Sequence, residues 1–137
     1  LGLAASIQPQ HAMDDRDVIA RFWGTPAGIP YAFNSLHKAG TKLLMGSDAP
    51  VAPLDPWMAI SAAVFGTESS DREPFQPEQC LDFETALASS TAVGRVADLV
   101  LLDCDPSIID SPEAMRAMPE HVLGTMLAGR WTYQQAE

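Results

Sequence analysis

A short apolar segment that stops abruptly at a polar loop constrains the fold of this chain most. Residues 42–45 (KLLM) have a glycine on either side, and Pro50 and Pro53 lie close behind them. An apolar run bounded by such breakers predicts a short buried strand. The loop after this strand carries Asp48, and in α/β folds the ends of strands are where sites form.

Asp48 has two interpretations on local sequence. An aspartate before a proline commonly hydrogen-bonds its own backbone in a turn, and a carboxylate at a strand end is also typical of a catalytic group. The residues that follow favour the second interpretation, because Asp55 suits a helix cap and Pro56 the first helical position. The predicted order is therefore strand, loop with Asp48, and helix over residues 55–64.

A second unit of this kind precedes the first. Residues 3–7 predict a short strand that ends in the polar segment 8–11 (QPQH). Pro30 is expected to begin a helix that ends at Gly40, with one apolar face formed by Ala32, Phe33, Leu36 and Ala39. Alternation of strands and helices predicts an α/β fold, with a parallel sheet covered by helices.

Three blocks resemble the C-terminal part of amidohydrolase family 3, and they occur in the family's order. They are residues 6–11 (SIQPQH), residues 46–50 (GSDAP) with 55–57 (DPW), and residues 97–103 (ADLVLLD). This family belongs to the metal-dependent amidohydrolase superfamily. The resemblance implies a (β/α)₈ barrel of the TIM type beside a small β-sandwich. Residues 1–92 would then be the last strands and helices of the barrel, and residues 93–137 the C-terminal strands of the sandwich.

The resemblance also implies an activity and a site. The activity is hydrolysis of a carbon–nitrogen bond in a small-molecule, non-peptide amide, with a divalent metal, expected to be zinc. Asp48 would be the aspartate after the eighth strand, which contacts the metal and accepts a proton from the attacking water. Bound metal lowers the pKa of that water to about 7, so a nearby carboxylate can take its proton. Gln8 and His11 would line the substrate mouth.

The residues of this chain do not complete a metal site in sequence. A catalytic zinc usually has three protein ligands, and His11, His37 and His121 include no pair at metal-ligand spacing. In the family, a His-x-His pair and further histidines come from earlier strands. At 137 residues the chain is also shorter than the roughly 250 residues of a barrel. We therefore expect a fragment that neither binds zinc tightly nor hydrolyses amides alone; the alternative is a non-catalytic remnant or interaction module.

The remaining segments are expected to complete the fold without carrying catalytic residues. Residues 66–79 predict a solvated loop, although Arg72 or Phe75 could touch substrate by comparison with the family. The family comparison also indicates a shortened connection at 92–96. Residues 98–102 predict a strand whose apolar run lies between the acids Asp98 and Asp103, which favours a strand covered on both faces. A closing hairpin is predicted over residues 122–133.

Composition narrows the partners. The formal net charge of −10 argues against nucleic acid and anionic membrane surfaces, because both repel an acidic chain. No apolar run approaches the roughly 20 residues of a membrane span, and no signal peptide is recognisable. Cys80 and Cys104 are predicted to be free thiols of a cytoplasmic protein. Formation of a homo-oligomer stays open.

Overall fold

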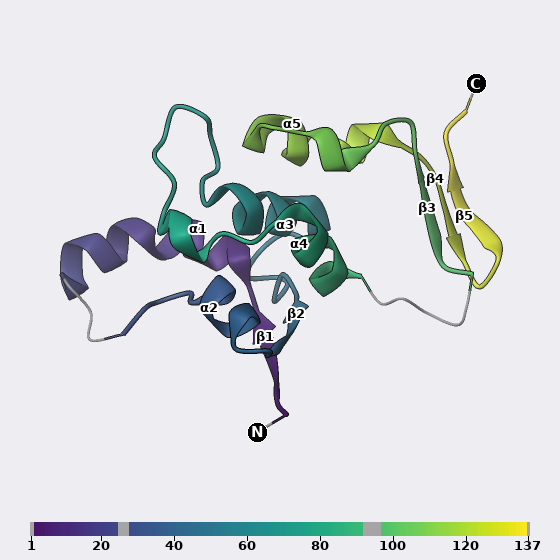
Figure 1. Cartoon of the computed structure of the whole chain (residues 1–137). Coiled ribbons are helices and arrows are strands. Elements are labelled where there is room, and N and C mark those ends of the chain that lie inside the picture. The colour runs from purple at the N-terminus through teal and green to yellow at the C-terminus, as the bar shows by residue number, and fades with distance from the viewer. Residues whose placement is uncertain (1, 25–27, 92–96, 137) are drawn as a thin grey trace.

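The computed structural model describes residues 2–24, 28–91 and 97–136. Figure 1 shows a helical part with a pair of parallel strands beside it, and a separate antiparallel sheet toward the C-terminus. The elements in chain order are β1 (Ala4–Ile7), α1 (Pro9–Val18) with a π-helical extension η1 (Ile19–Trp23), α2 (Phe33–Lys38), β2 (Lys42–Met45), α3 (Pro56–Phe65), η2 (Pro77–Gln79), α4 (Phe83–Ser90), β3 (Leu99–Leu102), η3 (Pro106–Ile108), α5 (Pro112–Arg116), η4 (Met118–His121), β4 (Val122–Leu127) and β5 (Arg130–Gln134).

The predicted parallel pairing is confirmed. Strand β1 pairs with β2 in register from Ala4 opposite Lys42 to Ile7 opposite Met45. The Gly46 amide extends this ladder by donating to the Ile7 carbonyl at 3.0 Å. The α/β class is thereby confirmed, while the complete barrel and sandwich, and the division at residues 92/93, stay predictions.

Helix ends follow the capping signals in the sequence. The Asp55 carboxylate accepts a hydrogen bond from the Trp57 amide at 2.9 Å, and Pro56 occupies the first turn of α3. Gly66 ends α3 in the left-handed conformation, with φ of 63°. The Asp82 carboxylate caps α4 through the Thr85 amide at 2.7 Å.

The predicted start of the helix before β2 is wrong by three residues. Helix α2 begins at Phe33 and not at Pro30. Tyr31 has φ of 54°, a left-handed conformation that a helix cannot include. Only the later part of the predicted apolar face remains helical, and of its members Phe33 is buried whereas Leu36 is partly exposed.

Helix α3 lies at the centre of the core. It packs against α1, α4 and α5, and Ile60 and Ala63 on it are almost fully buried. Strand residues Ile7 and Leu43 join the same cluster, as does Met115 from α5. Helix α5, which follows β3 in sequence, therefore packs against the core formed by the first part of the chain.

The prediction that β3 is covered on both faces is wrong. Leu99, Val100 and Leu101 are each more than half exposed, and every residue of β5 is exposed. In the part of the chain that the structure describes, strand β3 pairs only with β4, and β4 also pairs with β5, in an antiparallel sheet. Within the described residues this sheet has three strands, which are too few to cover both faces of β3. The hairpin prediction is confirmed, and no helix that the structure describes is long and apolar enough to cross a membrane.

Candidate functional site

The C-terminal ends of β1 and β2 lie at the same end of the parallel pair, and the residues that follow them form what we call the strand edge. Because Ile7 lies opposite Met45, the segment after β1 and the segment after β2 emerge side by side. Gln8 follows the first strand, and Ser47 and Asp48 follow the second. Both segments that carry predicted site residues are thus brought to the same edge, as a parallel arrangement requires.

Asp48 lies in the turn that follows β2. Its φ is 55°, in the left-handed region that aspartate adopts more readily than most residues, and its carbonyl accepts from the Val51 amide at 2.9 Å. The side chain is exposed. Among the residues that the structure describes, its carboxylate has no hydrogen-bond or ion-pair partner. The turn is formed by the backbone, so the carboxylate is left available for another molecule.

Gln8 and His11 lie at the start of a helix and not in an open loop. Pro9 begins α1, so His11 is in its first turn, and the His11 amide donates to the Gln8 carbonyl at 3.1 Å. The Gln8 side-chain amide donates to the Ser6 hydroxyl at 3.0 Å. The His11 Nε2 atom is buried and, within the described part of the chain, has no hydrogen-bond partner. Both side chains remain predicted substrate contacts.

A hollow of about 150 Å³ lies between the end of β2 and the start of α3. Neither Asp48, Gln8 nor His11 lines it, so the predicted site residues share a strand edge without sharing this hollow. Its lining residues are Met45, Gly46, Ser47, Leu54, Asp55, Pro56, Ala59 and Ser90.

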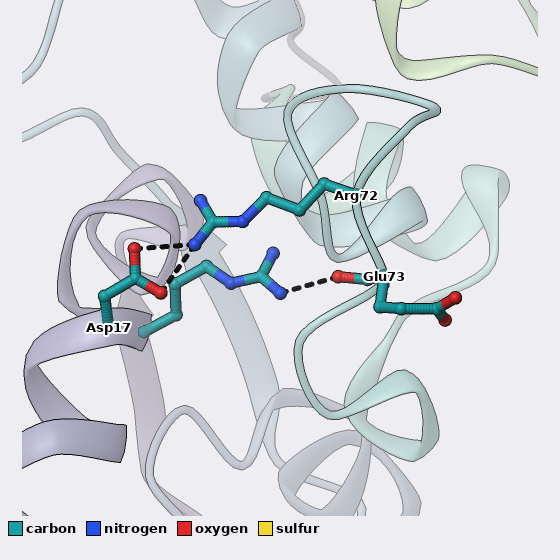
Figure 2. A network of polar contacts seen from close by, with 4 residues as sticks. Asp17, Arg72 and Glu73 are labelled. Carbon is teal, nitrogen blue, oxygen red and sulfur yellow. Dashed lines mark hydrogen bonds and ion pairs between the residues drawn. The ribbon is translucent and has the colours of Figure 1, made fainter.

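The loop after α3 is attached to the protein and is not a freely solvated connection. Figure 2 shows Arg72 reaching Asp17 on α1, with both carboxylate oxygens within 2.6 Å of one guanidinium nitrogen. Arg16 donates to the Glu73 carbonyl at 2.6 Å and lies 5.8 Å from the centre of the Phe75 ring. Burial lowers the pKa of Arg16, and the positive charge of Arg72 lowers it further. Arg72 and Phe75 are thus engaged in contacts within the protein.

The same loop is also bound to α5. The amide and hydroxyl of Ser70 both donate to the Glu113 carboxylate at 2.6 Å. These two hydrogen bonds lower the pKa of Glu113 to about 2. Arg116 donates to the Glu68 carbonyl at 3.2 Å. The loop therefore connects two helices, α1 and α5, that are distant in sequence.

A second cluster of reactive side chains lies where β3 ends and β4 begins. It comprises Asp103, Cys104 and His121, whose ligand atoms lie within 4.8 Å of one another. The His121 Nδ1 atom is 2.8 Å from an Asp103 carboxylate oxygen. Desolvation raises the pKa of the Cys104 thiol, and the Asp103 charge raises it further, which disfavours the nucleophilic thiolate.

In the part of the chain that the structure describes, this cluster is the one group of three or more His, Cys, Asp or Glu side chains placed to hold a metal. Asp48 belongs to no such group, so the strand edge offers one ligand where a catalytic zinc takes three. Sequence reasoning missed the cluster because its members are not at a motif spacing. Cys80 and Cys104 are free thiols, as predicted.

Comparisons with known proteins gave matches that cover nearly the whole chain. The model of a family described as "Amidohydrolase family" matches residues 1–133. The protein LONG AFTER FAR-RED 3 of Arabidopsis thaliana is 28% identical over 151 residues, which cover 97% of this chain and 25% of the relative. The putative amidohydrolase YtcJ of Bacillus subtilis (strain 168) is 26% identical over 153 residues, covering 98% of this chain and 28% of the relative. No solved structure matches.

The chain spans about a quarter of the length of these curated relatives. Both matched stretches are also longer than the 137 residues of the chain, so each relative contains segments that this chain lacks. The shortened connection predicted at residues 92–96 lies outside the described residues.

Proposed function

The chain belongs to the amidohydrolase family, and from this premise we propose that it forms the C-terminal portion of a metal-dependent hydrolase of carbon–nitrogen bonds in non-peptide amides. The observation that carries the proposal is the edge formed by parallel strands β1 and β2, from which Asp48 projects with no partner in the described residues. A small-molecule amide is the proposed substrate.

Asp48 is the proposed proton acceptor in this reaction. An exposed carboxylate without a partner is free to accept a proton from the water that attacks the amide carbon. A positioned general base of this kind contributes roughly 10²- to 10⁴-fold in rate. Gln8 follows β1 at the same edge and His11 lies in the first turn of α1, and their amide and imidazole groups are proposed to hydrogen-bond the substrate.

We propose that the metal is bound by the complete enzyme and not by this chain's strand edge alone. Members of this family generally depend on a metal, and we propose zinc, with Asp48 as one ligand. The edge of this chain offers that single ligand among the described residues and therefore does not fit a catalytic ion by itself. We accordingly propose that the 137 residues alone do not hydrolyse amides. Because cysteines stay reduced in the cytoplasm, the two free thiols support a cytoplasmic location.

The proposal is tested by determining the coding sequence on the 5′ side of the Leu1 codon and across residues 91–97. An open frame that encodes a His-x-His pair and two later histidines would supply the missing ligands and support the hydrolase. A stop codon or an unrelated sequence there would contradict it.

A non-catalytic interaction module is the second candidate. The exposure of Leu99, Val100 and Leu101 favours it, because an apolar strand open on both faces is typical of a surface that another protein segment covers. The same coding sequence distinguishes the two candidates, since a module without upstream histidines lacks the further ligands that a catalytic metal at Asp48 requires.

A further inference from the structure

We propose that Asp103, Cys104 and His121 form a zinc-binding site that is separate from the strand edge at Asp48. The three side chains provide one oxygen, one sulfur and one nitrogen ligand, all within 4.8 Å of one another. Zinc accepts this mixture of ligands, and a thiolate excludes magnesium and calcium, which prefer oxygen alone. The site would hold the ion with three protein ligands and leave one position for water.

The backbone holds the two segments of this site together. Asp103 and Cys104 directly follow β3, and His121 is the last residue of η4 before β4 begins. Leu102 pairs with Val122, and the Asp103 amide donates to the His121 carbonyl at 3.1 Å. The ligands therefore directly flank the paired ends of β3 and β4, which limits the rearrangement that binding requires.

The spacing of the side chains suits a small tetrahedral ion. Zinc bonds of about 2.0 to 2.3 Å place neighbouring ligand atoms about 3.3 to 3.8 Å apart. The Asp103 and His121 atoms, at 2.8 Å, need to separate slightly, and the thiol needs to approach by about 1.5 Å at most. The Asp103 and His121 side chains are 46% and 43% exposed. An ion can therefore reach the site from solvent.

Cys104 packs against the core cluster. Its sulfur lies 3.8 Å from the sulfur of Met118, which is fully buried in the core. This contact anchors the cysteine at the margin of the core, with its sulfur near the exposed Asp103 and His121. Binding would tie β3, η4 and β4 to the core cluster that includes Met118, so the ion would stabilise the folded state.

This inference departs from the sequence expectation that no ion binds tightly to these 137 residues. That expectation considered the strand edge at Asp48 and treated Cys104 as an isolated thiol. The pairing of β3 with β4 brings His121 to Cys104, and neither residue is close to the other in sequence.

The test is a titration of the purified 137-residue chain, freed of metal and kept reduced, with zinc chloride in a calorimeter. Titration with cobalt(II) in place of zinc reports directly on a thiolate ligand through its charge-transfer absorption. We expect one equivalent of zinc to bind with a dissociation constant of about 1 µM or below. Loss of an outer partner of a metal site already weakens binding about 10- to 100-fold, so Cys104→Ser and His121→Ala should each weaken it at least about tenfold.

Matched controls separate this site from other thiols and imidazoles. Cys80→Ser, His37→Ala and Asp48→Asn should leave zinc affinity and the cobalt spectrum unchanged, and circular dichroism of each variant checks that it is folded. Absence of zinc binding at micromolar concentrations overturns the proposal. An equal loss of affinity in Cys104→Ser and Cys80→Ser, or a loss confined to Asp48→Asn, overturns it as well.

Discussion

The Asp82 carboxylate accepts two hydrogen bonds from Thr85, from its amide at 2.7 Å and its hydroxyl at 2.8 Å. The bond from the Thr85 amide is the main reason why the pKa of Asp82 is lowered. A carboxyl whose pKa is lowered by folding stabilises the protein above its unfolded pKa of about 3.9, and this contribution is lost as the pH falls through the folded value. Asp82 therefore combines a cap with a charge.

Substitution separates these two roles. Asp82→Ala should lower the free energy of unfolding by about 1 kcal/mol at pH 7, the usual effect of removing a helix cap. The difference from the wild type should shrink as the pH falls below about 4. Asp82→Asn keeps a good capping residue without the titration, so its stability at pH 7 should stay close to that of the wild type. Urea unfolding at the two pH values measures both, and equal effects of the two substitutions at pH 7 would refute the cap.

At the scale of elements, the loop over residues 67–76 is fastened at both sides, by Asp17 on α1 and by Glu113 on α5. Arg72 and Asp17 are 38% and 75% exposed. Exposed ion pairs contribute at most about 1 kcal/mol. Arg72→Ala should therefore change the free energy of unfolding by less than about 1 kcal/mol while increasing hydrogen exchange at the amides of this loop.

Arg16→Ala should have the larger effect on the same loop. The Arg16 side chain is partly buried, donates to the Glu73 carbonyl and lies over Phe75, so its removal takes away packing as well as charge. Arg21→Ala is the matched control, because Arg21 lies over the exposed ring of its neighbour Phe22. Hydrogen exchange that rises as much in Arg21→Ala as in Arg16→Ala would argue against a specific attachment of the loop.

Elements whose ends are marked by glycine, proline or a capping residue could be predicted from the sequence. Strand β2 could be predicted to the residue because glycines bound a local apolar run, and α3 because Asp55 forms a cap within its own segment. Helix α1 gave no such signal. Residues 9–18 are mostly polar, and what places this helix is packing against α3, a contact that local sequence does not encode.

The candidate site was predictable only in part, for a related reason. Asp48 and Gln8 reach one edge because parallel strands necessarily end together, and alternating strands and helices predict that arrangement. The proximity of Cys104 to His121 depends on the antiparallel pairing of β3 with β4 and on a register shift after Leu101. Register of this kind is set by tertiary packing, so residue spacing alone could not reveal it.

For the whole molecule, the outer face of the C-terminal sheet predicts self-association. Leu99, Met126 and Trp131 are cross-strand neighbours, and Leu99, Leu101 and Trp131 are each about half exposed. A contiguous apolar face of this kind favours association in water. Size-exclusion chromatography with light scattering should show species larger than a monomer as the concentration rises.

A charge in this face should reduce the association. Leu101→Lys should shift the chain toward monomer, whereas Val18→Lys, at an exposed apolar position on α1, should not. A compact monomer at every concentration for the unsubstituted chain would contradict the prediction that this sheet needs a cover.

The central claim, that the strand edge at Asp48 serves amide hydrolysis, is tested most directly by kcat/KM of Asp48→Asn in the protein expressed from the complete open reading frame. Chromogenic amides with added zinc provide the assay, and Asp110→Asn, which changes an exposed acid elsewhere, provides the control. Loss of a general base predicts a fall of at least about 100-fold in Asp48→Asn, with Asp110→Asn unchanged. Activity of Asp48→Asn within about twofold of the control would contradict the account.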